Sequence, residues 1–199
     1  MQKKRGFTLI ELLVVIAIIG LLATIITASL GSARQKGRDA QRIANIRVIQ
    51  TSLELYYNDN LRYPTNIYAG SGSLSPNYIS VVPVDPGGSM TPSGCSASPG
   101  SAGCYVYSAS AFSNSSVCNA SNPAVKYHLG VALEQSNNSV LSSDVDAAVQ
   151  NFATTGYTVC TGGAGDFSGL SAPVSPAACT SVAGSAQPGG TETCYDATN

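Results

Sequence analysis

The sequence is short of the residues on which most enzyme active sites depend. It has no tryptophan and a single histidine, His128, and none of its six cysteines precedes Cys95. Lys126 is the only basic residue among residues 63–199, against seven acidic ones, so this part has a net charge of −6. That balance argues against a nucleic-acid-binding surface, and no serine–histidine–aspartate order, phosphate loop or carboxylate pair indicates catalysis. We expect a protein that is not an enzyme, uses no cofactor and binds no nucleic acid.

Charge is also missing near the N-terminus, where no ionisable side chain occurs from Leu12 to Ala33. The apolar run opens with Gly6-Phe7-Thr8-Leu9-Ile10-Glu11 and reaches Leu30. A helix needs about 20 apolar residues to cross a bilayer. Glu11 is the exception in this run, because a charged carboxylate in lipid costs about 2.5–3.5 kcal/mol even on the mildest scale. An acid kept at that cost indicates a functional role.

The residues around this acid form a motif. Three basic residues stand directly before Gly6, at Lys3, Lys4 and Arg5. Followed by Gly6 and Phe-Thr-Leu-Ile-Glu-Leu, they resemble the leader and mature N-terminus of type IV pilins and type II secretion pseudopilins. The resemblance implies that prepilin peptidase cuts between Gly6 and Phe7 and that Phe7 is then N-methylated. It also implies that copies of this chain form a filament, with minor pilins, a platform protein and an assembly ATPase as further partners.

Cleavage at this place would change the charge close to Glu11. Before cleavage the nitrogen of Phe7 is a neutral amide, and afterwards it is an α-amine with a reference pKa of about 8, mostly protonated at neutral pH. A buried carboxylate needs a cationic partner, because an unpaired buried charge costs more than the pair does. We expect Glu11 to pair with the Phe7 amine of a neighbouring subunit, so that removal of the leader starts assembly.

The helical pattern continues beyond the apolar run. Apolar residues such as Ile43, Ile46 and Leu53 recur at three- and four-residue steps, which predicts one helix over residues 7 to about 58. The polar residues between them are expected on a solvated helix face: Arg38, Arg42, Arg47 and Glu54. The expected division is a leader (1–6), a long helix (7–62, transmembrane over about 7–30) and an extracytoplasmic globular pilin-like domain (63–199).

Short strands are predicted in the globular domain. Residues 126–134 alternate between an apolar face that includes Leu129 and a polar, surface-exposed face that includes His128, as in a half-buried antiparallel strand packed on the helix. Further strands are expected at 104–108 and 156–160, and the Gly-, Ser- and Pro-rich chain after Asp166 predicts irregular loop. The expected fold class is α+β, with a long N-terminal helix packed on a small antiparallel sheet and a disulfide-tied irregular C-terminal region.

The cysteines indicate an oxidising compartment. An even number confined to the part outside the membrane favours up to three disulfides over free thiols, and six cysteines allow 15 pairings among which the sequence does not choose. The short intervening loop favours a bridge between Cys95 and Cys104. The candidate disulfide cysteines are Cys95, Cys104, Cys118, Cys160, Cys179 and Cys194.

Asp144 and Asp146 admit two interpretations. Carboxylate oxygens suit calcium, and related pseudopilins hold calcium in a C-terminal loop. Ser143 followed three residues later by Asp146 is also typical of a helix start, and this interpretation is preferred. The sequence therefore predicts no firm metal site.

Topology follows from the charges and the cysteines together. The leader charges favour a cytoplasmic N-terminus, basic residues at 34–42 oppose it, and the cysteines place the C-terminal part outside. We expect a single-pass inner-membrane protein that becomes the structural subunit of a pilus or pseudopilus. Two alternatives remain: a monomeric membrane-anchored binding module, and a secreted protein with an ordinary signal peptide cut after Gly31-Ser32-Ala33, although that class has a shorter apolar core.

Overall fold

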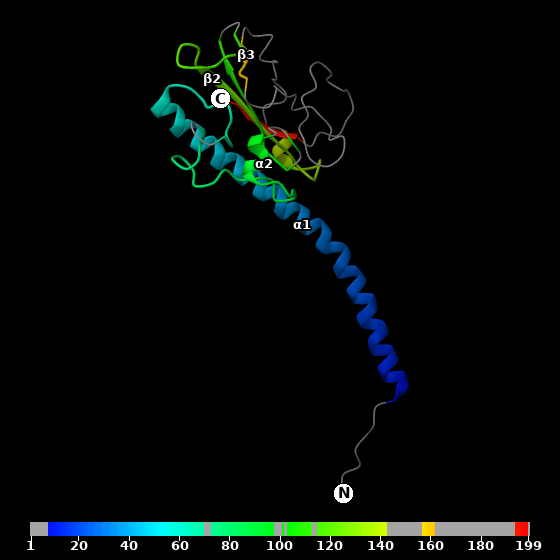
Figure 1. Cartoon of the computed structure of the whole chain (residues 1–199). Helices are drawn as coiled ribbons and strands as arrows, with labels where there is room; N and C mark the ends of the chain where they lie inside the picture. The colour runs from blue at the N-terminus through cyan, green and yellow to red at the C-terminus, as the bar shows by residue number, and fades with distance from the viewer. Residues whose placement is uncertain are drawn as a thin grey trace. The chain divides into compact units, whose positions relative to one another are not determined.

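The computed structural model describes residues 8–69, 73–97, 101, 103–112, 115–142, 157–161 and 194–198. The chain divides into two compact units, Met1–Gly37 and Arg38–Asn199. Figure 1 shows the elements in chain order, beginning with one long helix. That helix, α1, runs from Leu9 to Asn60 and contributes residues to both units.

The bounds of α1 follow from local chemistry. Thr8 precedes its first residue as an N-cap, and no proline interrupts the chain before Pro64. The helix ends where Leu61 takes a left-handed backbone conformation, with φ of 52°, and its amide donates to the carbonyl of Tyr57 at 2.7 Å. This is the helix-ending geometry usually given to glycine or asparagine. The helix predicted over residues 7 to about 58 is therefore present, at Leu9–Asn60.

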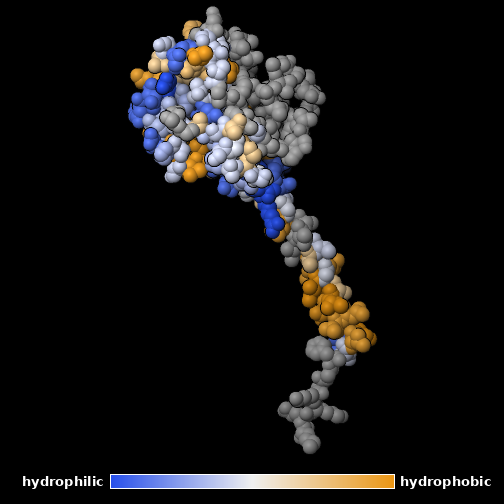
Figure 2. All heavy atoms as spheres, viewed as in Figure 1, coloured by the Kyte–Doolittle hydropathy of each residue, from blue (hydrophilic) through white to orange (hydrophobic). Residues whose placement is uncertain are grey.

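The first unit presents its apolar side chains outward. Large aliphatic residues from Leu9 to Ile25 are exposed, and Figure 2 shows hydrophobic residues gathered along this stretch of the helix. In length and composition this stretch suffices to cross a membrane. A soluble monomer rarely exposes so large an apolar surface without a function for it.

The second unit is built on a four-stranded antiparallel sheet in the order β3-β1-β2-β4. Val106 of β1 pairs with Gly130 of β2, and Ser110 pairs with Lys126. A short helix α2 and a 3-10 turn η1 complete the described elements. Their bounds are β1 Val106–Ala111, β2 Ala124–Ala132, β3 Thr158–Val159, β4 Cys194–Thr198, α2 Pro92–Ala97 and η1 Ser139–Ser142.

The core lies between the second half of α1 and the sheet. Ile46, Ile49 and Leu53 of α1 are fully buried in one cluster with Leu129 and Val131 of β2. Each such side chain contributes about 1.5–3 kcal/mol on burial. The α+β class, with the long helix on a small antiparallel sheet, is confirmed.

His128 departs from the expected surface position, because it is only 1% exposed. Residues 127–131 of β2 are all buried, and successive strand residues point to opposite faces. Both faces of this strand are therefore covered. The prediction of a half-buried strand was wrong, because the face that carries His128 is buried as well as the face that carries Leu129.

The C-terminal region also departs from expectation at its end. The prediction of irregular loop after residue 166 was wrong for Cys194–Thr198, which forms strand β4. Its five residues pair with residues 128–132 of β2, from His128 opposite Thr198 to Ala132 opposite Cys194. A five-residue strand following a Gly- and Ser-rich stretch has no distinct local signal, so its pairing partner decides its conformation.

Candidate functional site

Thr8 and Glu11 form a closed hydrogen-bonded unit at the start of α1. The Thr8 amide and the Thr8 hydroxyl each donate to Oε2 of Glu11 at 2.8 Å. In return the Glu11 amide donates to Oγ1 of Thr8 at 3.2 Å. This reciprocal pattern is a capping box, which satisfies amides that the first helical turn leaves without partners. The Thr-x-x-Glu spacing was visible in the sequence but was not used there.

The capping box leaves one side of the Glu11 carboxylate open. Both bonds from Thr8 reach Oε2, and within the part of the chain that the structure describes Oε1 accepts no hydrogen bond. The carboxylate is thus held in one orientation while retaining capacity for a further donor. Gly6 and Phe7, with the leader residues Lys3, Lys4 and Arg5, lie outside the described residues, so cleavage, methylation and the amine partner stay predictions.

The helical surface beyond the capping box is apolar and open. Leu9 is 83% exposed and Leu21 65%. Gly20 has no neighbour within 4 Å of where a Cβ atom would stand, which allows another helix to approach closely. The hydroxyl of Thr24 donates to the carbonyl of Leu21 at 2.7 Å, so this polar group is satisfied within the helix. The surface is suited to lipid or to the same helix of other copies.

A cluster of charged residues lies on the part of α1 that belongs to the second unit. Nη1 of Arg42 donates to Asp39 at 2.7 Å and to Glu134 at 2.9 Å, and its Nη2 donates to Asp85 at 2.7 Å. Arg38 forms a second ion pair with Glu134. We call these five residues the Arg42 cluster. It ties α1 to the loop before α2 and to the end of β2.

Arg42 departs from the expectation of a solvated helix face, which holds for Arg47 and Glu54. Arg42 is only 4% exposed and Asp39 only 1%. Asp39 also accepts the amides of Glu134 at 2.9 Å and Gln135 at 3.1 Å. Only Asp39 lies close to Arg42 in sequence, whereas Asp85 and Glu134 come 43 and 92 positions later. The pattern along the helix therefore did not reveal that Arg42 is buried.

The electrostatics of the Arg42 cluster favour its charged form. Burial alone would lower the pKa of Arg42, but its hydrogen bonds to Asp85, Asp39 and Glu134 hold that pKa above its ordinary value. The hydrogen bond from Arg38, with the one from Arg42, lowers the pKa of Glu134 against the opposing effect of burial. A buried guanidinium among carboxylates costs little only while all partners are in place. This arrangement is structural, and it fixes the fold around α1.

Two disulfides are described in the second unit. Cys95 is bonded to Cys104, the pair that the short loop favoured, and Cys118 is bonded to Cys160. Cys194 is also disulfide-bonded, and Cys179 lies outside the described residues.

Asp144 and Asp146 fall outside the described residues as well, so the calcium site and the helix start at Ser143 stay predictions. Within the described ranges, no three His, Cys, Asp or Glu side chains are grouped so as to hold a metal ion.

Comparison with known proteins agrees with the architecture of the N-terminal part. The family model of the prokaryotic N-terminal methylation motif matches residues 1–27. The chain is 33% identical over 102 residues to type II secretion system core protein G of Klebsiella pneumoniae, which covers 45% of this chain and 73% of that protein.

Other relatives match over shorter lengths. The protein of the same name from Dickeya chrysanthemi is 37% identical over 73 residues, covering 37% of this chain and 47% of the relative. That of Escherichia coli strain K12 is 39% identical over 64 residues, covering 32% and 44%. The chain thus spans less than half the length of these two relatives, and no solved structure matches it. With its methylation motif, its capped apolar helix and its match to most of the Klebsiella protein, the chain belongs to the pilin-like family of type II secretion system core protein G.

Proposed function

We propose that this chain is the structural subunit of a type II secretion pseudopilus, held in the inner membrane by the first half of α1 and polymerised through that helix. The observation that carries the proposal is the Thr8–Glu11 capping box at the head of an apolar, exposed helix. The relatives named above are core proteins of a type II secretion system, which supports the same role. The subunit catalyses nothing and is itself the substrate of prepilin peptidase.

Maturation supplies the charge that Glu11 needs. Prepilin peptidase removes residues 1–6 and methylates the nitrogen of Phe7, which becomes a cationic amine with a reference pKa of about 8. The two bonds from Thr8 hold Oε2, so Oε1 is presented to an incoming donor. The amine of a neighbouring copy neutralises the carboxylate in lipid, where an unpaired charge is costly. Assembly therefore follows cleavage.

The long helix and the globular domain have separate roles in the proposed filament. Residues 7–62 form the stem, and residues 63–199 form the extracytoplasmic domain, carried on α1 outside the inner membrane. The partners of the filament are minor pilins, the platform protein and the assembly ATPase, which acts from the cytoplasmic side. An oxidising exterior suits the disulfides of the second unit.

The test separates the charge of Glu11 from its capping role. Glu11→Gln keeps an oxygen that accepts from Thr8, because glutamine also serves in a capping box, but it removes the charge. Glu11→Ala removes both functions. The full chain is expressed with a complete secretion machine, its N-terminus is determined by mass spectrometry, and its filaments are imaged by electron microscopy.

We expect the wild-type chain to begin at methylated Phe7, and both variants to be cleaved but to form few filaments. Glu11→Gln filaments at the wild-type rate would show that capping is sufficient and would overturn the charge mechanism. A wild-type filament that retains residues 1–6 would overturn the proposed maturation. A mature chain that forms no filament beside a working machine would favour the monomeric anchored binding module.

A further inference from the structure

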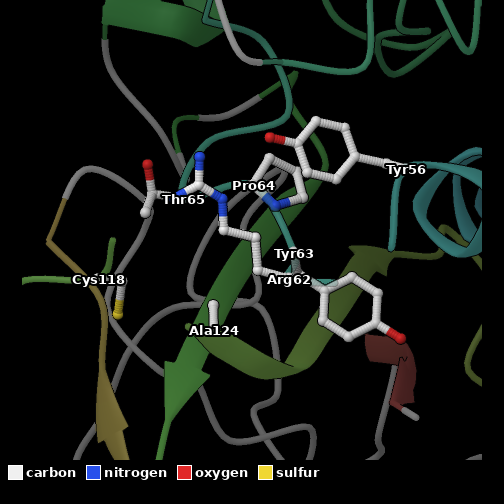
Figure 3. A pocket seen from close by; sticks show the side chains of 7 residues that line it. All are labelled: Tyr56, Arg62, Tyr63, Pro64, Thr65, Cys118 and Ala124. Carbon is white, nitrogen blue, oxygen red and sulfur yellow. The ribbon is translucent and has the colours of Figure 1, made fainter. Parts of the chain in front are cut away.

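A recess of about 200 Å³ lies where α1 ends, between its last turn, the segment after it and Cys118. Figure 3 shows the hydroxyl of Tyr56 turned toward the guanidinium of Arg62, with Thr65 on the other side of that guanidinium. Tyr63 also lines the recess, but its hydroxyl is already engaged by Glu54, at 3.1 Å from Oε1. Among the described residues that line the recess, none is acidic.

Three polar groups of this recess, those of Tyr56, Arg62 and Thr65, are hydrogen-bond donors without partners in the described part of the chain. Arg62 as a residue is partly buried, and its guanidinium has no ion pair there. Tyr56 is only 5% exposed, its ring is held edge-on against Tyr78 at 5.2 Å, and its hydroxyl makes no hydrogen bond to any described residue. Thr65 adds a second hydroxyl. None of these donor atoms is among the buried atoms without a partner, so they are accessible from the open recess and can bind an anion there.

The backbone next to Arg62 is strained and is fixed by contacts on both sides of the recess. Leu61 adopts a φ of 52°, a left-handed conformation that residues with a side chain rarely adopt. The Tyr63 amide then donates to the carbonyl of Ala124 at 2.8 Å, which fixes the segment to the start of β2. The Cys118–Cys160 disulfide fixes the opposite wall.

We propose that this recess binds one carboxylate group, with the Arg62 guanidinium as the charged donor and the Tyr56 and Thr65 hydroxyls as neutral donors. A guanidinium pairs with a carboxylate through two parallel hydrogen bonds. A monoanion is favoured over a phosphate, which carries about −1.5 to −2 charges, because residues 63–199 have a net charge of −6. The carboxylate comes from a free carboxylate in solution or from an acidic side chain of a second copy. This inference does not depend on the proposed filament.

The test measures the reaction of phenylglyoxal, an arginine reagent, with the full chain in detergent. The rates at Arg62 and at exposed Arg47 are read by mass spectrometry in the same digest, with acetate, inorganic phosphate or chloride at equal ionic strength. Acetate is expected to slow the reaction of Arg62 several-fold and to leave Arg47 unchanged. Equal effects on both arginines, or no protection of Arg62, would overturn the proposal, and stronger protection by phosphate would overturn the choice of a carboxylate.

A variant tests the donor set. Tyr56→Phe keeps the ring contact with Tyr78 and removes one hydroxyl, so the acetate concentration that halves the rate at Arg62 should rise about tenfold or more, as for a hydrogen bond to a charged group. Tyr195→Phe on β4 is the matched control and should change nothing. If Tyr56→Phe leaves this acetate concentration unchanged, the Tyr56 hydroxyl is not one of the donors. The source of the carboxylate is tested without added acetate, by measuring the rate at Arg62 at increasing protein concentration. If protection of Arg62 increases with protein concentration, the carboxylate comes from a second copy. If acetate protects Arg62 but protein concentration does not, the ligand is a free carboxylate.

Discussion

Replacing Arg42 by leucine should destabilise the second unit more than any other single loss of charge on α1. The side chains of Arg42 and Asp85 are each 5% exposed, and that of Asp39 is 1% exposed. The variant leaves both carboxylates buried without their cation, which costs about 3–5 kcal/mol. A domain of this size is stable by about 5–15 kcal/mol. With a urea dependence of about 2 kcal/mol per molar, the unfolding midpoint should fall by about 2 M.

The assay is urea unfolding of the oxidised full chain in detergent, followed by the near-ultraviolet circular dichroism of its ten tyrosines, since tryptophan is absent. Arg38→Leu is the matched control, because the Arg38 side chain is 35% exposed and, among the described residues, forms its one ion pair with Glu134. An exposed pair contributes about 0–1 kcal/mol, so the unfolding midpoint of Arg38→Leu should shift by less than about 0.5 M. If the two variants shift the midpoint equally, Arg42 does not compensate the buried carboxylates and the argument for the cluster fails.

Three further predictions use the same assay. Leu61→Gly should raise the free energy of unfolding by about 0.5–1 kcal/mol, since Leu61 is 71% exposed and only its left-handed strain is relieved; a loss of stability would contradict that strain. Opening the Cys118–Cys160 bridge by paired serine substitution should cost about 4 kcal/mol for its separation of 42 residues, and a cost under about 1 kcal/mol would show that the unfolded chain is already constrained. The pKa of Glu134 is lower in the folded than in the unfolded chain. The contribution of its carboxylate to the free energy of unfolding is therefore fully present above the unfolded pKa of about 4.3 and is lost as pH falls through the folded pKa. Glu134→Gln should therefore reduce the loss of stability on acidification, and an unchanged pH dependence would contradict the assignment.

The buried positions of α1 could be predicted well because their signal is local. Ile46 and Leu53 recur at the helical period and both are fully buried against the sheet. Alternation likewise predicted β2, although the strand lies at Ala124–Ala132 and the neighbouring one at Val106–Ala111 rather than at 104–108. Strand ends depend on where a partner stops pairing, which a single segment does not specify.

The sequence by itself determined the apolar stem and its capped start, because a charge-free stretch and a Thr-x-x-Glu spacing act within a few residues of chain. Only the tertiary structure decided that Arg42 is buried and that β4 exists. It alone placed the donors of Tyr56 and Arg62 in one recess. The physical reason is distance along the chain: the carboxylates that neutralise Arg42 lie up to 92 positions away, and β4 pairs with a strand more than 60 positions before it. Such partners meet only when the helix and the sheet pack, so no local pattern records them.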